Sequence, residues 1–254
     1  MARLPRYLLW VLALSVPLWA AAHFLDATKI IPVKLPLSAL QFLSVLGAAL
    51  IAGREHGESV GTFLKRGLDL SRIADRRWRV GVFVMMPVVV FASYELARIG
   101  AVSLVKNTTP LYVLPAALLV YGISGYAEQL GWTAVMTDAL LERFSVLKAG
   151  LIVGVTWSAW HVIPFTQTHN SAAWIAWQCL FTIIYRILLT KVYVATGRSV
   201  FSTVAMHATY NTAFTMLPYY GSSYRPMDMA IVTLLMTSAA FAVRMGGDDM
   251  PHGG

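Results

Sequence analysis

The sequence predicts an all-α, polytopic membrane protein with about eight transmembrane helices, and three observations support this fold class. Of the 254 residues, 57% are hydrophobic and only 13% are charged, whereas soluble domains carry about 25% charged residues. The mean hydropathy is +0.63. The apolar residues gather in runs of about 20, the length that a transmembrane helix needs. This composition excludes a disordered chain, an ordinary cytosolic enzyme and a basic nucleic-acid-binding protein.

Eight apolar runs follow one another along the chain, and no soluble domain fits between them. They cover about residues 7–25, 36–52, 80–97, 111–138, 147–166, 172–192, 199–217 and 227–244. We therefore treat residues 1–254 as a single transmembrane domain. The first run could also be a signal peptide, because Ala20, Ala21 and Ala22 resemble a cleavage site, but its length and the later runs favour an uncleaved helix.

The fourth run is unusual in its length. From Leu111 to Leu141 it is too long for one upright span. It also carries three glycines, Gly122, Gly125 and Gly131, which weaken a helix interior. We therefore expect a tilted or broken helix here.

The basic residues predict the topology. The net charge is +8, and basic residues of membrane proteins collect in cytoplasmic loops. With eight spans and an inner N-terminus, 15 of the 20 Lys and Arg residues fall in inner segments, with Arg186, Lys191 and Arg198 counted together in one of them. The N- and C-termini are therefore expected in the cytoplasm. Within this set, residues 60–79 alternate apolar and basic side chains, which predicts an amphipathic segment on an anionic membrane surface.

Ionisable side chains inside apolar runs are the next signal, because each costs at least about 2.5–3.5 kcal/mol in hydrocarbon and normally marks function. Glu128 lies within the fourth run, and Ser124 is one turn earlier on the same face. The alternative is a helix that ends near residue 127 and leaves Glu128 solvated at the interface. Apolar residues continue to Leu141, which argues against that alternative.

A second cluster lies in the fifth run, where Trp157 and His161 share a helix face. Gly150, Gly154 and Ser158 form a stripe of small residues just before His161, which lets a neighbouring helix approach closely. The alternative for His161 is a neutral core histidine bonded to a carbonyl group.

A third cluster is a polar stripe with a spacing of four residues in the seventh run. It consists of Ser199, Thr203, His207, Asn211 and Thr215. Packing alone would not require such a stripe, although a seam of interhelical hydrogen bonds would explain it. Together, the three clusters supply a carboxylate, two imidazoles and an amide, which is enough for water activation and oxyanion stabilisation.

These clusters resemble the motifs of the CPBP family of intramembrane proteases, to which the CAAX prenyl endopeptidases belong. The family pattern Glu-Glu-x-x-x-Arg, aromatic-x-x-x-His and His-x-x-x-Asn is similar to residues 128–133, 157–161 and 207–211, and the resemblance covers about residues 80–217. Two positions depart from the pattern: Gln129 stands in place of the second Glu, and Thr133 in place of Arg. The loss of Arg removes a cation that could hold the carboxylate.

The resemblance implies an endopeptidase with a polar catalytic cavity that opens towards the cytoplasmic side. It implies that Glu128 is the catalytic base, that His161 helps to activate the water, and that His207 and Asn211 stabilise the oxyanion. We expect three neighbouring residues to contact the substrate: Gln129, Trp132 and Trp157. The expected partners are a peptide or lipidated protein, including a prenylated CAAX-like protein, and the lipid bilayer; the oligomeric state is open.

Other interpretations remain open at this stage. Zinc could be bound by Glu128, His161 and His207, but the histidines do not form an H-E-x-x-H helix, so no cofactor is favoured. The protein could instead be a non-catalytic membrane protein with a protease-like fold, such as an immunity factor or scaffold. A haem carrier would use His161 and His207 as axial ligands but would leave Glu128 and Asn211 without a role. A transporter would use Glu128 as a proton site.

Overall fold

A computed structural model describes residues 3–24, 37–55, 57–100, 109–168, 170–216 and 224–242, and these residues form helices, turns and loops without a strand. The predicted all-α class is therefore confirmed. The α-helices are α1 (Arg3–Phe24), α2 (Phe42–Glu55), α3 (Val60–Lys65), α4 (Arg76–Ile99), α5 (Leu114–Gly131), α6 (Asp138–Leu141), α7 (Val146–Gln167), α8 (Ala172–Ala195), α9 (Val200–Met216) and α10 (Pro226–Ala242). Two short 3-10 helices, η2 (Leu37–Gln41) and η3 (Leu111–Val113), and one π-helix, η4 (Trp132–Thr137), complete the described elements.

Each of the eight predicted apolar runs contains a helix, but the helices differ in length. Five helical stretches of the described chain are long and apolar enough to cross a membrane: Leu4–Phe24, Arg76–Ile99, Leu111–Leu141, Val146–Gln167 and Ala172–Ala195. Helix α10 is apolar but shorter, and α2 and α9 have 14 and 17 residues. The polytopic architecture is confirmed, and the count of eight spans stays a prediction.

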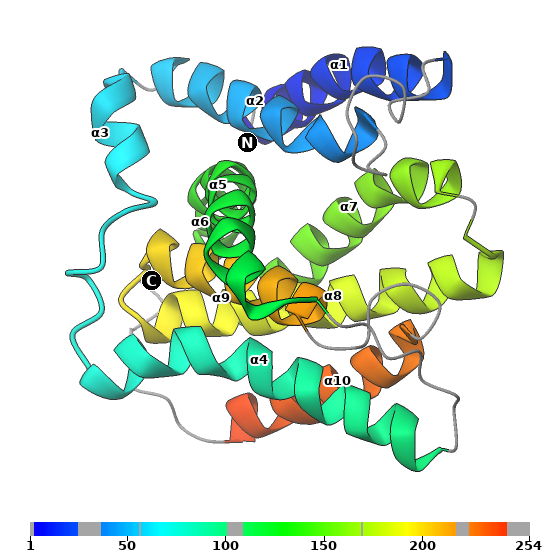
Figure 1. Cartoon of the computed structure of the whole chain (residues 1–254). Helices are drawn as coiled ribbons and strands as arrows, with labels where there is room; N and C mark the ends of the chain where they lie inside the picture. The colour runs from blue at the N-terminus through cyan, green and yellow to red at the C-terminus, as the bar shows by residue number, and fades with distance from the viewer. Residues whose placement is uncertain are drawn as a thin grey trace.

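Helix α5 lies in the middle of the bundle (Figure 1). In that view, α1 and α2 lie on one side of α5, and α4 and α10 lie on the other. Helix α5 packs against α2 and α9, while α7 and α8 form a closely packed pair. Large apolar side chains such as Leu119 and Phe91 remain exposed on the outside of the protein, as expected for helices that face lipid.

Glycine explains the close α7–α8 pairing. A Cβ atom on Gly150 would lie 2.8 Å from Ile187 Cα, and one on Gly154 would lie 3.0 Å from both Cα and O of Ile183. Such distances to backbone atoms leave no room for a side chain, so the predicted stripe of small residues does allow a close helix approach.

Polar caps mark where the helices around the site begin. The Ser145 hydroxyl accepts a hydrogen bond from the Lys148 amide at the start of α7, and Ser171 accepts one from the Trp174 amide at the start of α8. These bonds satisfy amide groups that lack intrahelical partners. Gly197, with a φ of +67°, occupies the left-handed region in the turn after α8.

The long fourth run is continuous but irregular. Helix α5 passes through the π-turn η4 into α6, and the Thr137 hydroxyl donates to the Trp132 carbonyl at 2.8 Å inside that turn. A side chain at position 131 would collide with Tyr7 and Val45, so this residue must be glycine. The predicted break is thus a π-turn, and the alternative in which the helix ends near residue 127 is wrong.

Residues 60–79 fold differently from a single amphipathic helix. Helix α3 covers only residues 60–65, a series of turns follows, and Asp75 caps the start of α4. Phe63 and Ile73 are buried, whereas Leu68 and Leu70 are exposed. Half of these apolar side chains therefore pack on the protein, and a membrane contact of this segment stays a prediction.

One part of the charge count needs correction. Arg186 and Lys191 do not lie in a loop: both are buried within α8, and Arg186 has no exposed surface. Only Arg198 of that group lies in the turn after the helix. Most Lys and Arg residues remain in the predicted inner segments without Arg186 and Lys191, and the orientation of the termini stays a prediction.

Candidate active site

Trp157 of α7 is the centre of the predicted site. Its indole Nε1 donates a hydrogen bond to Glu128 Oε2 of α5 at 2.8 Å. Its ring meets the rings of His161 and His207 edge to face, with centroids 5.3 and 5.5 Å apart. Glu128, Trp157 and His207 are each less than 10% exposed. The three motifs, which lie on three different helices, therefore meet at one place, as the sequence predicts.

His161 lies at the edge of this group. Its Nδ1 is 2.9 Å from the carbonyl oxygen of Trp157, one helical turn earlier, and its ring stacks on Phe165. A neutral imidazole that donates from Nδ1 keeps an acceptor lone pair on Nε2. The carbonyl bond is the one expected of a core histidine, but the half-buried position beside Trp157 also leaves Nε2 able to hold a water.

His207 is held by a second chain of polar contacts. Its Nδ1 is 3.0 Å from Gln129 Nε2, and Gln129 Oε1 accepts a hydrogen bond from the Thr133 hydroxyl at 2.7 Å. Arg186 Nη1 of α8 donates to both Gln129 Oε1, at 3.0 Å, and Thr133 Oγ1, at 3.1 Å. The guanidinium also lies over the Trp157 ring, 4.5 Å from its centroid. We call Glu128, Gln129, Thr133, Trp157, Arg186 and His207 the inner network.

The polar stripe of α9 also forms a seam with α5 and η4. Thr203 donates to Thr133 at 3.3 Å, His207 meets Gln129, and the hydroxyl groups of Thr215 and Tyr121 are 2.8 Å apart. The interpretation of this stripe as an interhelical hydrogen-bond seam is therefore confirmed. His207 takes part in both the seam and the site.

Three other residues singled out in the sequence have different surroundings. Asn211 is one turn after His207 on α9 and is half-buried, so its amide lies on the same helix face. Trp132 is fully buried, with its ring against those of Tyr7 and Trp160. Ser124 donates to the Tyr121 carbonyl at 3.3 Å. A substrate contact of Trp132 would need this packing to open, and it stays a prediction.

Comparison with known proteins adds an independent finding. Residues 107–213, which include all three motifs, match the sequence model of a family described as type II CAAX prenyl endopeptidase Rce1-like. Over 179 residues the chain is 26% identical to "CAAX prenyl protease 2" of Methanococcus maripaludis. This match covers 65% of the present chain and 63% of the length of that relative. Both matches support a relationship between this chain and the CPBP/CAAX protease family.

Arg186 is the residue that sequence reasoning missed. The CPBP/CAAX pattern has Arg at position 133, and its replacement by Thr133 was expected to remove a cation from the site. In the structure, Arg186 brings a guanidinium to the Thr133 hydroxyl from α8. The signal was present: Arg186 follows 14 uncharged residues within an apolar helix, and a cation at such a position normally has a function.

Zinc ligation by Glu128, His161 and His207 is the alternative use of these side chains. Within the described residues, no three His, Cys, Asp or Glu side chains gather as a metal ligand set. As arranged, Glu128, His161 and His207 are not such a ligand set, and no step below uses a metal ion.

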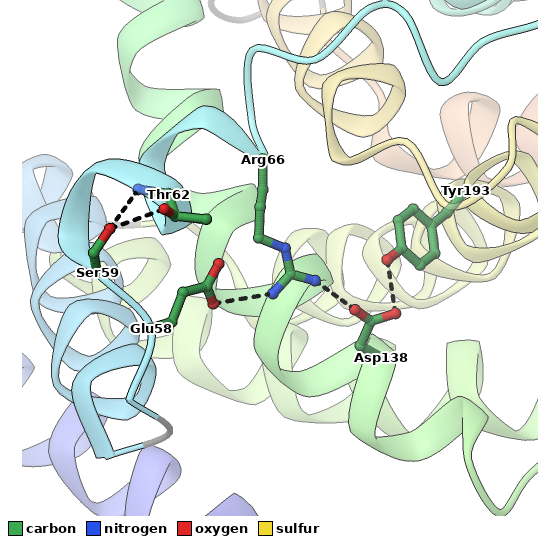
Figure 2. A network of polar contacts seen from close by, with 6 residues as sticks. All are labelled: Glu58, Ser59, Thr62, Arg66, Asp138 and Tyr193. Carbon is green, nitrogen blue, oxygen red and sulfur yellow. Dashed lines mark hydrogen bonds and ion pairs between the residues drawn. The ribbon is translucent and has the colours of Figure 1, made fainter.

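A second polar cluster lies at the far end of the α5–η4–α6 helix (Figure 2). Arg66, just after α3, lies between Glu58 and Asp138, with Nη2 2.6 Å from Asp138 Oδ2 and Nη1 3.8 Å from Glu58 Oε2. The Tyr193 hydroxyl donates to Asp138 Oδ1 at 2.7 Å, and Arg198 Nη1 is 3.6 Å from the same oxygen. We call these five residues the outer network.

A cavity of about 250 Å³ adjoins the outer network. Arg66 and Asp138 line it together with apolar residues such as Phe63 and Leu140, but Glu128, His161 and His207 do not. This cavity is therefore not the predicted catalytic cavity, which stays a prediction.

Proposed function

We propose that this protein is an intramembrane endopeptidase that hydrolyses a peptide bond of a membrane-associated substrate. The observation that carries the proposal is the meeting of Glu128, His161 and His207 around one indole inside a helical membrane bundle. The match of residues 107–213 to the type II CAAX prenyl endopeptidase Rce1-like family supports the same activity.

In the proposed mechanism, Glu128 is the general base. Because the Trp157 indole holds Oε2, Oε1 is the oxygen that takes a proton from water. His161 Nε2 helps to hold that water as an acceptor. The resulting hydroxide attacks the carbonyl carbon of the peptide, and the C=O electrons move onto oxygen to form a tetrahedral oxyanion.

The oxyanion is stabilised by two donors on α9, the His207 imidazole and the Asn211 amide. Donors that are held in place before the reaction lose little free energy to reorganisation when the charge forms. The intermediate then collapses: the C–N bond breaks, and Glu128 gives its proton to the leaving amine. The products are one new carboxylate terminus and one new amine terminus.

A prenylated or CAAX-like protein is the proposed substrate class, because the archaeal relative carries the name of a CAAX prenyl protease. The proposed orientation places both termini and the opening of the site on the cytoplasmic side, where most basic residues of the chain are predicted to lie. Gln129, Trp132 and Trp157 are proposed to contact the substrate.

The second candidate is a non-catalytic scaffold or immunity factor, and the motif departures Gln129 and Thr133 are the reason to consider it. The two functions differ in one prediction. A protease needs a basic carboxylate at position 128, whereas a scaffold needs only the shape of that side chain.

The deciding experiment compares the peptide termini of membranes from cells with the wild-type protein and with Glu128→Gln. Gln keeps an oxygen that can accept from Trp157 but cannot act as a base, so cleavage products are expected to disappear. Glu95→Gln, which changes a partly exposed carboxylate paired with Arg98 on α4, is the matched control. Identical termini and an unchanged cellular phenotype in Glu128→Gln would favour the scaffold. Stoichiometric zinc whose removal stops cleavage would refute the metal-free mechanism.

A further inference from the structure

Two donors converge on one oxygen atom of the Gln129 side chain. Arg186 Nη1 donates to Gln129 Oε1 at 3.0 Å, and the Thr133 hydroxyl donates to it at 2.7 Å. A guanidinium has donors but no acceptor. The side of the Gln129 amide that faces α8 must therefore be its oxygen, and the orientation of this amide is fixed by chemistry.

The other end of the amide faces His207. Gln129 Nε2 is 3.0 Å from His207 Nδ1, and an amide NH2 group can only donate. His207 Nδ1 must therefore accept, which requires a lone pair on that nitrogen. A neutral imidazole with a lone pair on Nδ1 carries its proton on Nε2.

From these contacts we infer that Arg186 is a positioning residue which, through the Gln129 amide, holds His207 in the tautomer with its proton on Nε2. The inference deepens the proposed function, on which it rests for the role of that proton: an Nε2–H group is the donor that the oxyanion needs. Arg186 itself touches neither the water nor the substrate, since it has no exposed surface.

The environment of Arg186 suits this role better than a role in stability. No described carboxylate lies within ion-pair distance of it, and its Nε and Nη2 atoms have no hydrogen-bond partner among the described residues. Burying such a charge is costly, and its compensation comes from Gln129, Thr133 and the Trp157 ring. Because arginine stays protonated, it remains a donor to Gln129 and cannot exchange its role for that of an acceptor.

The test measures the tautomer directly, without a substrate. Protein labelled with 15N-histidine is placed in lipid nanodiscs, and two-bond proton–nitrogen correlations identify which nitrogen of His207 carries the proton. The His207 signals are assigned by their loss in His207→Gln. The wild-type protein is expected to show the Nε2–H tautomer.

Gln129→Glu is the decisive variant. A carboxylate only accepts, so His207 is expected to place a proton on Nδ1. Gln178→Glu is the matched control, because Gln178 is also a buried glutamine, on α8, but bonds to Tyr224; it is expected to leave the His207 spectrum unchanged. Arg186→Met is expected to give a mixture of tautomers, and Arg186→Lys, which keeps a charged donor, is expected to restore much of the Nε2–H form.

An Nδ1–H tautomer in the wild-type protein, or an unchanged spectrum in Gln129→Glu, would overturn the inference. If Arg186→Met does not fold, the comparison of Gln129→Glu with Gln178→Glu still decides. A protein without peptidase activity but with the Nε2–H tautomer would refute the proposed function and leave the positioning role standing.

Discussion

The inner and outer networks are both built around an arginine, but they stabilise its charge in opposite ways. In the outer network, Arg66 pairs with Asp138 and Glu58, and the side chains of the Arg66–Asp138 pair are 27% and 26% exposed. In the inner network, Arg186 is fully buried and bonds to an amide, a hydroxyl and an aromatic ring. The outer arginine is neutralised by carboxylates, and the inner arginine is oriented by neutral groups.

This difference separates an arginine that contributes to stability from one that we assign to function. A partly exposed ion pair contributes about 0–1 kcal/mol, because water already solvates both charges well. A charge in the centre of a membrane helix costs at least about 2.5–3.5 kcal/mol. The fold therefore gains a little from Arg66 and has to stabilise Arg186 against a large cost, which is why we assign Arg186 a role in the site.

Among the variants that test this comparison of the two networks, the largest effect is expected from Trp157→Phe. It tests how far the inner network depends on one N–H group. Phenylalanine keeps an aromatic face for Arg186 and His207 but removes the donor to Glu128 Oε2. A hydrogen bond to a charged group contributes about 1.5–3 kcal/mol, so kcat/KM is expected to fall about 10–100-fold. Peptidase assays at several substrate concentrations would measure it. Unchanged kcat/KM would mean that Glu128 needs no orientation by α7.

A smaller effect is expected from Gly154→Ala, which forces α7 and α8 apart and with them Trp157 and Arg186. The new methyl group would lie 3.0 Å from backbone atoms of Ile183. Overpacking of this kind costs about 1–3 kcal/mol, which thermal unfolding in nanodiscs would detect as a lower midpoint. Gly122→Ala on α5 is the matched control, since nothing lies within 4 Å of its added Cβ. Equal midpoints for the two variants would contradict the close contact between α7 and α8.

The smallest effect is expected from Asp138→Asn in the outer network. The substitution removes the charge that pairs with Arg66 and keeps an oxygen for the Tyr193 hydroxyl. A loss of up to about 1 kcal/mol is expected at low salt, and less at high salt because ions screen exposed pairs. Unfolding midpoints at two salt concentrations would measure this loss. A large loss of peptidase activity without a loss of stability would break the distinction between the two networks.

The sequence predicts the fold well where a local rule decides the structure. Apolar runs of span length predicted the helices. The spacing of Gly150 and Gly154 predicted a close contact with a neighbouring helix, which the structure identifies as α8. The resemblance to the CPBP motifs also implied that Glu128, His161 and His207 belong to one site. The structure of residues 60–79 was harder to predict, because contacts with other helices decide which of their side chains are buried and which are exposed.

Contacts between distant residues account for what the sequence could not predict. Arg66 and Asp138 are 72 positions apart, and Arg186 and Gln129 are 57 apart; no local pattern joins either pair. Arg186 could have been singled out as a buried charge. Its partners could not, because only the three-dimensional structure shows that its guanidinium reaches Gln129 and Thr133.

The π-turn at residues 132–137 has a consequence for both networks. It places one more residue in a turn than an α-helix would, and one residue corresponds to a rotation of about 100° around the helix axis. The residues after the turn therefore point in different directions from those that an unbroken α-helix would give them. Glu128 can face α7 while Asp138, on the same continuous helix, contacts Arg66 and Tyr193. One extra residue thus lets a single continuous helix serve two polar networks that face different neighbours.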